Sequence, residues 1–599
     1  MFKWRFKLFI CILLGARAAG AVDVWTAGGS GSAWDDVGEL TGLTTDASVL
    51  LPAVVDPTTN AVELLTLKRR GGNISSPQSR EDLTGLLTDS NVETFWRVTR
   101  ERRPDGTSMV IDLGAILPIN RIRFQGNPDI FLRAYELFVH DGNPAQLRED
   151  LPIAFINQVS ANLEQGESDI DAHIPLQFVR FIRLISRSGQ EFIIEEVEVF
   201  GDGFAPTGSY LSEVIDLGEA ANFGQLRLQT RSDPLTNVVL QTRTGTVSDP
   251  KIYYRKTDIF EGEDRQEEPI LPIGSPEAAD EYDDLTSSDK GAIIDNIDEW
   301  SPWSAPYEDF FGDMLSPGNR RYVQFRLLFS SEDARQSAFV DSLSFDYSIP
   351  TLAEELTAEV TPATVTLGES NTFDYYIRST FGDANDGFDR VEIRTPFKAT
   401  VNSVELDGEP VAFTEEDAQD ESRLAIQLTN DRVTESGQLL RIRFEAMVTV
   451  YGTTFFAKVF DSQTGELGQD VVAGDATPEA QADRLSIQGA LRQELVLELQ
   501  ADPPVFSPNG DGINDQLQVS YILLRALSQV PADLIVYDLA GRPVRNLQKS
   551  GALNGPQQAT WDGLDENGAT VPPGLYILRL SIETDTGSED QSLLVGLAY

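Results

Sequence analysis

The chain has 599 residues, of which 41% are hydrophobic, and it carries 95 acidic against 47 basic residues, a formal net charge of −48. This length exceeds what one hydrophobic core supports and predicts three to five domains of roughly 100–150 residues, while the apolar content excludes general disorder. The acidic balance repels phosphate backbones and anionic lipid, so we expect neither a nucleic-acid partner nor membrane insertion.

Residues 1–21 have the composition of a secretory signal peptide. Three basic residues in Met1–Lys7 precede an apolar run at Leu8–Ala16, and the small residues Ala19-Gly20-Ala21 precede a cleavage site. The apolar run is too short to span a bilayer. The only cysteine, Cys11, lies in this segment, so the processed chain would have no thiol for disulfides, metal sites or nucleophilic catalysis. An exported protein without disulfides is typical of bacteria.

Alternation of apolar and polar residues dominates the remaining chain. Gln225–Thr230, Tyr322–Leu327 and Leu440–Phe444 each place apolar residues at every second position, the pattern of a strand with one buried face. Together with 47 glycines and 31 prolines, this pattern predicts an all-β fold of tandem β-sandwiches.

The predicted domains succeed one another along the chain. They are a lead-in at 22–70, which adds one or two strands to the next domain, a first sandwich at 71–204, a second sandwich at 205–349, an Ig-like spacer with a linker at 350–494, and a C-terminal domain at 495–599.

The first sandwich contains a series of short motifs in a fixed order. They are Asn73-Ile-Ser-Ser76, Leu87-Thr-Asp89-Ser-Asn91, Thr94-Phe-Trp96, Met109-Val-Ile-Asp112-Leu-Gly114, Tyr135–Gly142, Phe178–Leu184 and Glu195–Gly201. With these motifs, residues 71–204 resemble the discoidin family, also called the coagulation factor 5/8 type C or galactose-binding-like domain. The resemblance implies an eight-stranded jelly roll that binds sugars, other glycans or lipid headgroups through loops at one end. The family's terminal cysteines and a spike of exposed aromatics are missing, which argues against lipid binding.

Four arginines follow Trp96 in a strongly acidic chain, namely Arg97, Arg100, Arg102 and Arg103. Guanidinium groups bind carboxylates and sulfates in a forked geometry, so we expect these residues to bind an acidic glycan. The alternative is that they neutralise neighbouring acids and keep a loop soluble.

The resemblance also implies a calcium ion that pins a loop beside the first strand, with Asp89 and Asn91 as contributors.

The second sandwich is interrupted by the segment Asp258–Glu299, which contains fifteen acidic and two basic residues and few strand-like runs. We interpret it as a solvated insertion, and the alternative is a loop that gathers cations or docks a partner.

Trp300 and Trp303 lie in the same domain, where core packing is the expected role and stacking on a sugar ring is the alternative. This domain resembles β-sandwich modules of large bacterial surface proteins. Residues 351–480 resemble an Ig-like spacer.

The C-terminal domain has the most specific motifs of the chain. They are Phe506-Ser-Pro-Asn509-Gly-Asp511-Gly-Ile513-Asn-Asp515, Val536–Val544, Trp561-Asp-Gly563 and Val571-Pro-Pro-Gly574-Leu-Tyr576. Residues 495–599 thereby resemble the FlgD-type Ig-like domain, which occurs in flagellar hook-assembly proteins, secreted bacterial proteases and type IX secretion cargo. The resemblance implies a role in attachment or export.

The loop between Asn509 and Asp515 is a candidate calcium site. Oxygen-bearing side chains alternate at Asn509, Asp511 and Asp515, two glycines permit a tight curl, and the carbonyl of Ile513 supplies a further ligand. The low charge of this set predicts weak affinity, at about 0.1–1 mM. The alternative is a metal-free Asn/Gly turn.

The sequence provides no recognisable catalytic domain. Its two histidines, His140 and His173, lie in strand-like contexts, and metalloprotease, phosphate-loop and nucleophile-elbow motifs do not occur. We therefore expect a non-enzymatic, glycan-binding or adhesive protein that is secreted or held on the bacterial outer surface, with glycans and partners of export or surface assembly. The alternatives are a structural subunit of an extracellular assembly or surface layer and a glycan-degrading hydrolase, because carboxylate-pair hydrolysis needs no histidine.

Overall fold

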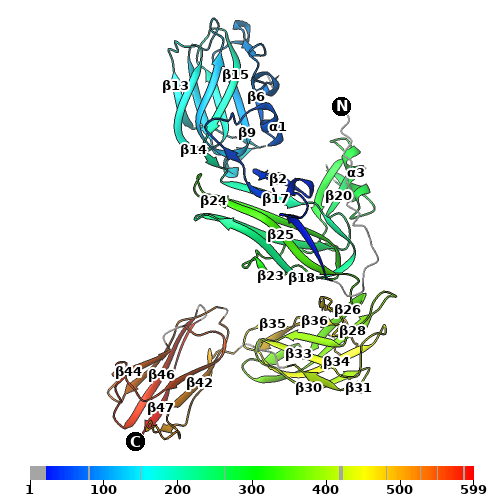
Figure 1. Cartoon of the computed structure of the whole chain (residues 1–599), viewed down its shortest axis with the longest axis vertical. Coiled ribbons are helices and arrows are strands. Elements are labelled where there is room, and N and C mark those ends of the chain that lie inside the picture. The colour runs from blue at the N-terminus through cyan, green and yellow to red at the C-terminus, as the bar shows by residue number, and fades with distance from the viewer. Residues whose placement is uncertain are drawn as a thin grey trace. The chain divides into compact units, whose positions relative to one another are not determined.

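The computed structural model describes residues 22–599 except 79–80, 149, 262–263, 417–421, 481, 491, 527, 549–550 and 585–586. The predicted signal peptide at 1–21 lies outside the described residues. The described chain consists mostly of β-strands in several sheets, which confirms the predicted class of tandem β-sandwiches (Figure 1). It forms two compact units, residues 22–349 and residues 350–599. Within the described residues, every helix is too short or too polar to cross a membrane.

The first sandwich contains an eight-stranded sheet that folds back on itself. Its strands are β6 (Asn73–Ser76), β7 (Glu81–Asp82), β8 (Trp96–Val98), β9 (Ser108–Gly126), β10 (Tyr135–His140), β13 (Asn157–Asn162), β14 (Ile170–Ser186) and β15 (Phe192–Gly201), with the short helices α1 (Leu64–Arg69) and α2 (Thr84–Leu87). The two long strands β9 and β14 pair along both of their halves, so that Met109 lies opposite Leu184 and Phe124 opposite Ile170. Between these halves β9 passes through Gly114, whose φ of 75° lies in the left-handed region.

The second sandwich is built from two separate stretches of the chain. Its strands are β1 (Asp23–Gly28), β2 (Gly38–Thr41), β3 (Leu43–Asp46), β4 (Val49–Pro52), β17 (Thr207–Ser212), β18 (Ile215–Ser232), β19 (Thr236–Gly245), β23 (Phe311–Asp313), β24 (Arg320–Ser331) and β25 (Ala338–Ser348). Thus β1 pairs with β25, and β2 pairs with β17. Trp34, which is 1% exposed, packs its ring edge-on against Tyr210 of the same core.

The predicted lead-in at 22–70 therefore divides between two domains. Its strands β1–β4 belong to the second sandwich and not to the domain that comes directly after them, whereas Val55, Val62 and Leu67 enter the core of the first sandwich. The first sandwich is consequently an insertion in the second. The chain passes from the second sandwich into the first at β5 (Val54–Val55) and returns at β16 (Gly203–Phe204). These two crossings lie side by side, because β5 pairs with β16.

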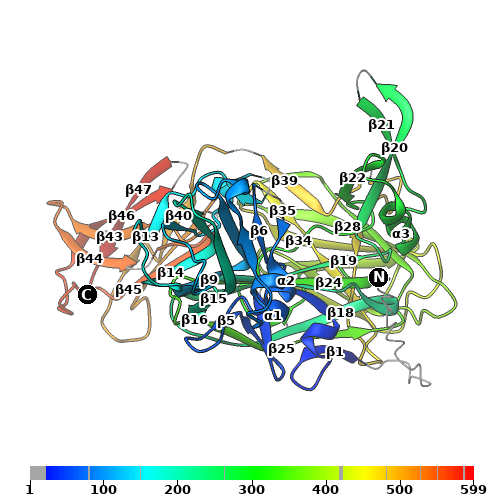
Figure 2. The same cartoon turned by 90° about the horizontal axis from the view of Figure 1, so that it is seen from above.

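The acidic segment is more regular than its sequence predicts. The strands β20 (Lys251–Glu261), β21 (Asp264–Pro269) and β22 (Lys290–Asp295) form a three-stranded sheet beside α3 (Pro276–Asp284). Figure 2 shows the hairpin of β20 and β21 projecting from the second sandwich. Basic side chains cross-link this sheet and α3: Arg255, on β20 just before the acidic segment, bonds to Glu268 and Glu281, and Arg265 within the segment bonds to Asp289. Sparse bases among many acids thus serve as cross-links, which composition alone does not reveal.

The second unit begins with the Ig-like domain. Its strands are β26 (Glu355–Thr361), β27 (Thr364–Thr366), β28 (Ser370–Thr380), β29 (Arg390–Arg394), β30 (Thr400–Leu406), β31 (Glu409–Pro410), β32 (Phe413–Glu415), β33 (Arg423–Leu428), β34 (Leu439–Met447), β35 (Gly452–Thr454), β36 (Ala457–Phe460), β37 (Gln469–Asp470), β38 (Val472–Ala473) and β39 (Ser486–Ala490). A buried carboxylate fixes its last loop, because Glu359 accepts backbone N–H bonds from Ala476, Thr477, Ala482 and Asp483.

The C-terminal domain packs a three-stranded sheet on a five-stranded one. Its strands are β40 (Val496–Asp502), β41 (Val505–Phe506), β42 (Leu517–Leu523), β43 (Ala532–Asp538), β44 (Pro543–Gln548), β45 (Gly555–Trp561), β46 (Gly574–Thr584) and β47 (Gly587–Leu597). Trp561 is fully buried between Phe506 and Tyr576, with both ring centroids 5.2 Å away. This domain shares a core with the Ig-like domain, because Ile522 and Leu524 pack among Ig-like core residues.

Candidate functional site

One end of the first sandwich is formed by three loops that adjoin its long strands. They are residues 99–107, 127–134 and 186–191. Backbone hydrogen bonds of 2.8 Å connect these loops to one another and to the adjoining strands: the N–H of Gly106 donates to Ser186 at the end of β14, that of Arg187 to Ala134, and that of Ile193 in β15 to Ile130. Loops fixed to one another in this way can hold side chains in a constant arrangement.

Two of the four predicted arginines are engaged in exposed ion pairs at this end. Arg97 lies on β8 opposite Ile193, and its Nη2 is 3.3 Å from Oε2 of Glu191. Arg102 lies in a short 3-10 turn, with its Nη1 3.2 Å from Oε2 of Glu81. Exposed pairs of this kind contribute only about 0–1 kcal/mol. A ligand carboxylate or sulfate can therefore replace the protein carboxylate at little cost.

The other two predicted arginines, Arg100 and Arg103, are exposed on the same turn. In the part of the chain that the structure describes, neither side chain forms an ion pair. Arg103 has a φ of 52°, so the backbone reverses there before β9 begins. The four arginines thus all lie in or beside one loop at this end of the domain, and their role in ligand binding stays a prediction.

Further basic residues at this end were not predicted from the sequence. The guanidinium carbon of Arg133 lies 3.5 Å from the ring centroid of the buried Phe131, which is a cation–π contact. Arg187 bonds to Glu136 at 2.6 Å. Both arginines lie in loops far from Arg97 in the sequence, and only the folded chain brings these loops together.

A partly buried hydrogen bond supports the loop at 127–134. Glu195, 9% exposed, accepts a bond of 2.8 Å from the amide of Asn127. The amide oxygen of Asn127 in turn accepts the backbone N–H groups of Asp129 and Ile130. Asn127 therefore connects the loop at 127–134 to Glu195 of β15 and fixes its conformation. This support accounts for Glu195, which the sequence shows only as one of several acids in the closing strand.

A second cluster, the Glu196 cluster, consists of Asp89, Asn91, Thr94 and Glu196. The Thr94 hydroxyl donates to both oxygens of Asp89, at 2.9 and 3.1 Å, and the backbone N–H of Asn91 donates to Asp89 and to Glu196. Glu196 is 6% exposed. Two of these residues, Asp89 and Asn91, were predicted to contribute to a calcium site. The other two were not, because alternation in the closing strand is sufficient to explain a glutamate there.

The chemistry of the Glu196 cluster fits a hard divalent cation. Burial, together with the nearby carboxylates of Asp89 and Glu198, raises the pKa of the Glu196 carboxyl to about 7. All the side chains offered are oxygen donors of the kind that calcium prefers. Together the two carboxylates and the Asn91 and Thr94 oxygens would hold the ion, which would supply the positive charge that the buried carboxylate lacks. In the described residues no group of three or more His, Cys, Asp or Glu side chains is arranged to hold a metal, so the two carboxylates would share the task with neutral oxygens.

The predicted calcium loop of the C-terminal domain is curled around Asp515. The two oxygens of Asp515 accept the N–H groups of Gly510 and Gly512 at 2.7 Å. Asn509 and Asp511 accept the N–H groups of Asp511 and Ile513 in the same manner. These backbone bonds lower the pKa of Asp515. The loop is thus closed by its own hydrogen bonds, and calcium binding by Asn509, Asp511, Asp515 and the Ile513 carbonyl stays a prediction.

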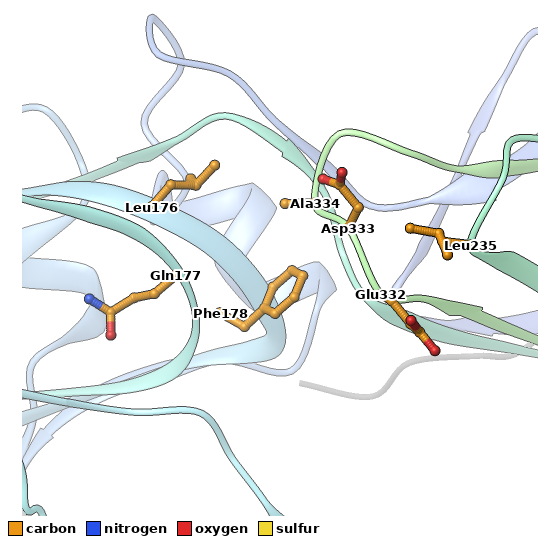
Figure 3. Close-up of a pocket in the computed structure, with 7 residues that line it drawn as sticks. All are labelled: Leu176, Gln177, Phe178, Leu235, Glu332, Asp333 and Ala334. Carbon is orange, nitrogen blue, oxygen red and sulfur yellow. The ribbon is translucent and has the colours of Figure 1, made fainter.

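A cleft of about 400 Å³ lies at the other end of the first sandwich, away from the loops that carry the four arginines. It is lined by Leu176, Gln177, Phe178, Leu235, Glu332, Asp333 and Ala334. Figure 3 shows that the carboxylates of Glu332 and Asp333 point in different directions and that the Gln177 amide points away from Phe178. The Gln177 amide is instead bonded to Asn157 and to the carbonyl of Pro175. Since its polar groups do not converge, the cleft is better explained as a junction between the two sandwiches than as a binding site.

Trp300 and Trp303, two of the tryptophans of the second sandwich, both contact other groups of the protein. Trp300 is 3% exposed and donates from its indole N–H to the carbonyl of Val247. Trp303 has two guanidinium groups near its ring, those of Arg243 and Arg326, each 4.5 Å from the ring centroid. The structure therefore agrees with the expected packing role for Trp300. The ring of Trp303 contacts the guanidinium groups of Arg243 and Arg326.

The two histidines do not form a common site. His140 is buried, with Phe155 and Phe181 edge-on to its ring, whereas the side chain of His173 is 73% exposed.

Residues 501–595 match the family model described as the CHU_C type IX secretion signal domain. This match implies export to the cell surface or the extracellular space. The FlgD-type resemblance of the same region stays a prediction. No curated protein is significantly similar to the chain.

Several solved structures are similar to a part of the chain. The module CpGH89CBM32-6 produced by Clostridium perfringens has 14% sequence identity and a TM-score of 0.18, with 22% of this chain and 93% of the module covered. Chitosan-binding module 2 of a chitosanase/glucanase from Paenibacillus sp. IK-5, in complex with chitotriose, has 19% identity and a TM-score of 0.17, with 19% of this chain and 84% of the module covered. The module CpGH89CBM32-5 from Clostridium perfringens, in complex with GalNAc-β-1,3-galactose, has 19% identity and a TM-score of 0.18, with 22% and 97% covered.

Proposed function

We propose that this chain is an exported, non-enzymatic protein that binds an acidic glycan at the loop end of the first sandwich. The observation that carries the proposal is the gathering of basic side chains on three hydrogen-bonded loops, in a chain whose net charge is −48. At physiological salt, exposed charges separated by more than about 8 Å are largely screened. An anion at this end therefore experiences mainly the local charges, which are these arginines with the paired Glu81, Glu136 and Glu191, and little of the distant acids.

The arginines supply two kinds of contact. Arg100 and Arg103 are exposed and offer forked N–H pairs to a carboxylate or sulfate. Arg97 and Arg102 each hold a protein carboxylate through one contact, which a ligand carboxylate or sulfate would replace. The C-terminal domain, in this proposal, serves export and attachment, and the intervening domains present the binding end.

Binding of the full chain without residues 1–21 to an array of acidic and neutral glycans tests the proposal. Isothermal titration then compares the double variant Arg100→Ser/Arg103→Ser with a matched double variant, Arg335→Ser/Arg542→Ser, whose arginine side chains are 72% and 80% exposed. We expect at least a tenfold loss of affinity for an acidic glycan in the first variant and no change in the second. Equal affinity of both variants for every glycan bound would refute the proposed site.

A further inference from the structure

The second sandwich carries an exposed aromatic ring beside a hollow on its outer face. Phe311, on β23, is 64% exposed and lies opposite Arg227 of β18 in the strand register. The guanidinium carbon of Arg227 is 5.7 Å from the Phe311 ring centroid. A shallow hollow of about 400 Å³ is lined by Arg227, Leu228, Gln229, Asp309, Phe310 and Phe311.

The charged groups of this face are arranged in pairs. Arg227 bonds to both oxygens of Asp346, with both distances 2.7 Å. Further along β18, Arg231 bonds to both oxygens of Asp341 at 3.1 and 3.2 Å. Each guanidinium is thus neutralised by a carboxylate, and the pairs leave further N–H groups and lone pairs toward solvent.

Uncharged polar side chains fill the space between the pairs. In the register of β18 with β25, Arg227 lies opposite Ser344 and Gln229 opposite Ser342. Directly opposed residues share one face of a sheet, as do residues two apart on a strand. The hydroxyls of Ser342 and Ser344 therefore lie on the same face as Arg227, Gln229 and the Arg–Asp pairs. We call this set, together with Phe311, the Phe311 face.

The Phe311 face has the chemistry to recognise a neutral sugar. A sugar ring offers hydroxyls that both donate and accept hydrogen bonds, and a C–H surface that packs against the negative face of an aromatic ring. The paired guanidinium and carboxylate groups and the Gln229 amide supply both donors and acceptors. Exposed Asp309 lines the hollow and repels an anionic ligand.

We propose that the Phe311 face binds a neutral polysaccharide chain, as a second binding site that is separate from the loop end of the first sandwich. Phe311 stacks on one sugar ring, and Arg227, Gln229 and Asp346 form hydrogen bonds with hydroxyls of that ring or its neighbour. The two sites differ in charge, so the protein would connect an acidic glycan with a neutral one.

Native affinity electrophoresis of the full chain without residues 1–21 tests this proposal. The gels contain one of three soluble neutral probes: hydroxyethylcellulose, galactomannan or xyloglucan. The variants are Phe311→Ala and Gln229→Ala. The matched control is Phe456→Ala, which removes a ring of similar exposure, 62%, from the Ig-like domain. Melting temperatures of all variants show whether they are folded.

We expect retardation of the unmodified chain by at least one neutral probe, a loss of affinity of tenfold or more in Phe311→Ala, and a several-fold loss in Gln229→Ala. Phe456→Ala and the Arg100→Ser/Arg103→Ser variant should migrate as the unmodified chain does, which separates this site from the one at the loop end. Retardation by none of the three probes, or an unchanged Phe311→Ala, would overturn the proposal.

Discussion

The backbone N–H of Asn91 donates a hydrogen bond of 2.8 Å to the buried carboxylate of Glu196, a residue 105 positions away in the sequence. This bond joins the loop after α2 to the closing strand β15 of the first sandwich. Asp89 and Thr94 complete the contact from the loop side. The carboxylates of Asp89 and Glu196 accept no hydrogen bond from Lys or Arg among the described residues, so their shared negative charge makes this contact sensitive to cations and to pH.

Calcium is expected to stabilise the first sandwich through the Glu196 cluster. An ion that binds only the folded state at 100 times its Kd adds about 2.7 kcal/mol to the free energy of unfolding. Thermal melting of the full chain carrying Asp511→Ala, which removes a predicted calcium ligand of the C-terminal loop, measures the effect with calcium and with chelator. Glu196→Gln should abolish the calcium-dependent rise of the melting temperature. Glu198→Gln, which changes a neighbouring glutamate paired with Arg123, should preserve it. A rise that persists in Glu196→Gln would place the calcium elsewhere.

Without calcium, the stability of the first sandwich should fall as the pH rises from about 4.5 to about 7. The pKa of Glu196 is raised from 4.5 in the unfolded chain to about 7 in the folded one. Between these values the folded state retains a proton that the unfolded state releases, so the stabilisation present at pH 4.5 is lost as the pH passes through 7. Urea denaturation in chelator at several pH values measures this slope. Glu196→Gln should flatten it, and an equally steep slope in that variant would assign it to other groups.

Glu191→Gln is expected to increase the affinity for an acidic glycan. The carboxylate of Glu191 lies 3.3 Å from the Arg97 guanidinium, so a ligand must break this ion pair to bind Arg97. An exposed ion pair contributes up to about 1 kcal/mol, which corresponds to about fivefold in Kd. Titration of the full chain with its acidic glycan measures the change. Arg97→Ser should weaken binding. If Glu191→Gln also weakens binding, Glu191 contacts the ligand rather than competing with it.

The loop from Asn509 to Asp515 is expected to bind calcium weakly, at about 0.1–1 mM. Hydrogen exchange of this loop with calcium and with chelator reports on it directly, separately from the first sandwich. Asp511→Ala should remove the calcium-dependent protection. Asp533→Ala, on β43 of the same domain, serves as the control. Exchange that does not respond to calcium would identify the loop as a turn closed by its own hydrogen bonds.

Leu524→Ala is expected to destabilise both domains of the second unit. Leu524 is fully buried and packs in the core of the Ig-like domain although it directly succeeds β42 of the C-terminal domain. Truncation of a buried leucine costs about 2–5 kcal/mol. Hydrogen exchange should increase in the strands of both domains, whereas Leu553→Ala, at a side chain 59% exposed, should leave both unchanged. Faster exchange in the C-terminal domain alone would show that the shared core does not couple them.

The sequence predicts the sandwiches well because alternation records directly which face of a strand is buried. Phe373, Tyr375 and Ile377, for example, are spaced by two and all are fully buried on β28. Alternation does not record which sheet covers that face. The strands at 23–52 therefore look like an extension of the domain next to them in the sequence, whereas Leu50 and Trp34 are buried in a core whose other residues come mainly after position 205.

The candidate sites show the same limit. Arg97, Arg100, Arg102 and Arg103 are visible in the sequence because they are close together in an acidic chain. Arg133 belongs to the same end only through a loop contact, which has no local pattern. Glu196 is hidden for another reason: an acid at an alternating position of a strand is expected to point to solvent, but the loop at Asp89–Thr94 covers it.

The paired crossings at β5 and β16 determine how the first sandwich is anchored. Because the chain enters and leaves through adjacent antiparallel strands, a pull on a bound glycan is shared by two covalent connections instead of one. A single proteolytic cut at either crossing would leave the first sandwich attached through the other crossing. Release of this domain would require two cuts, so a ligand bound to it would stay connected to the rest of the chain after the first cut.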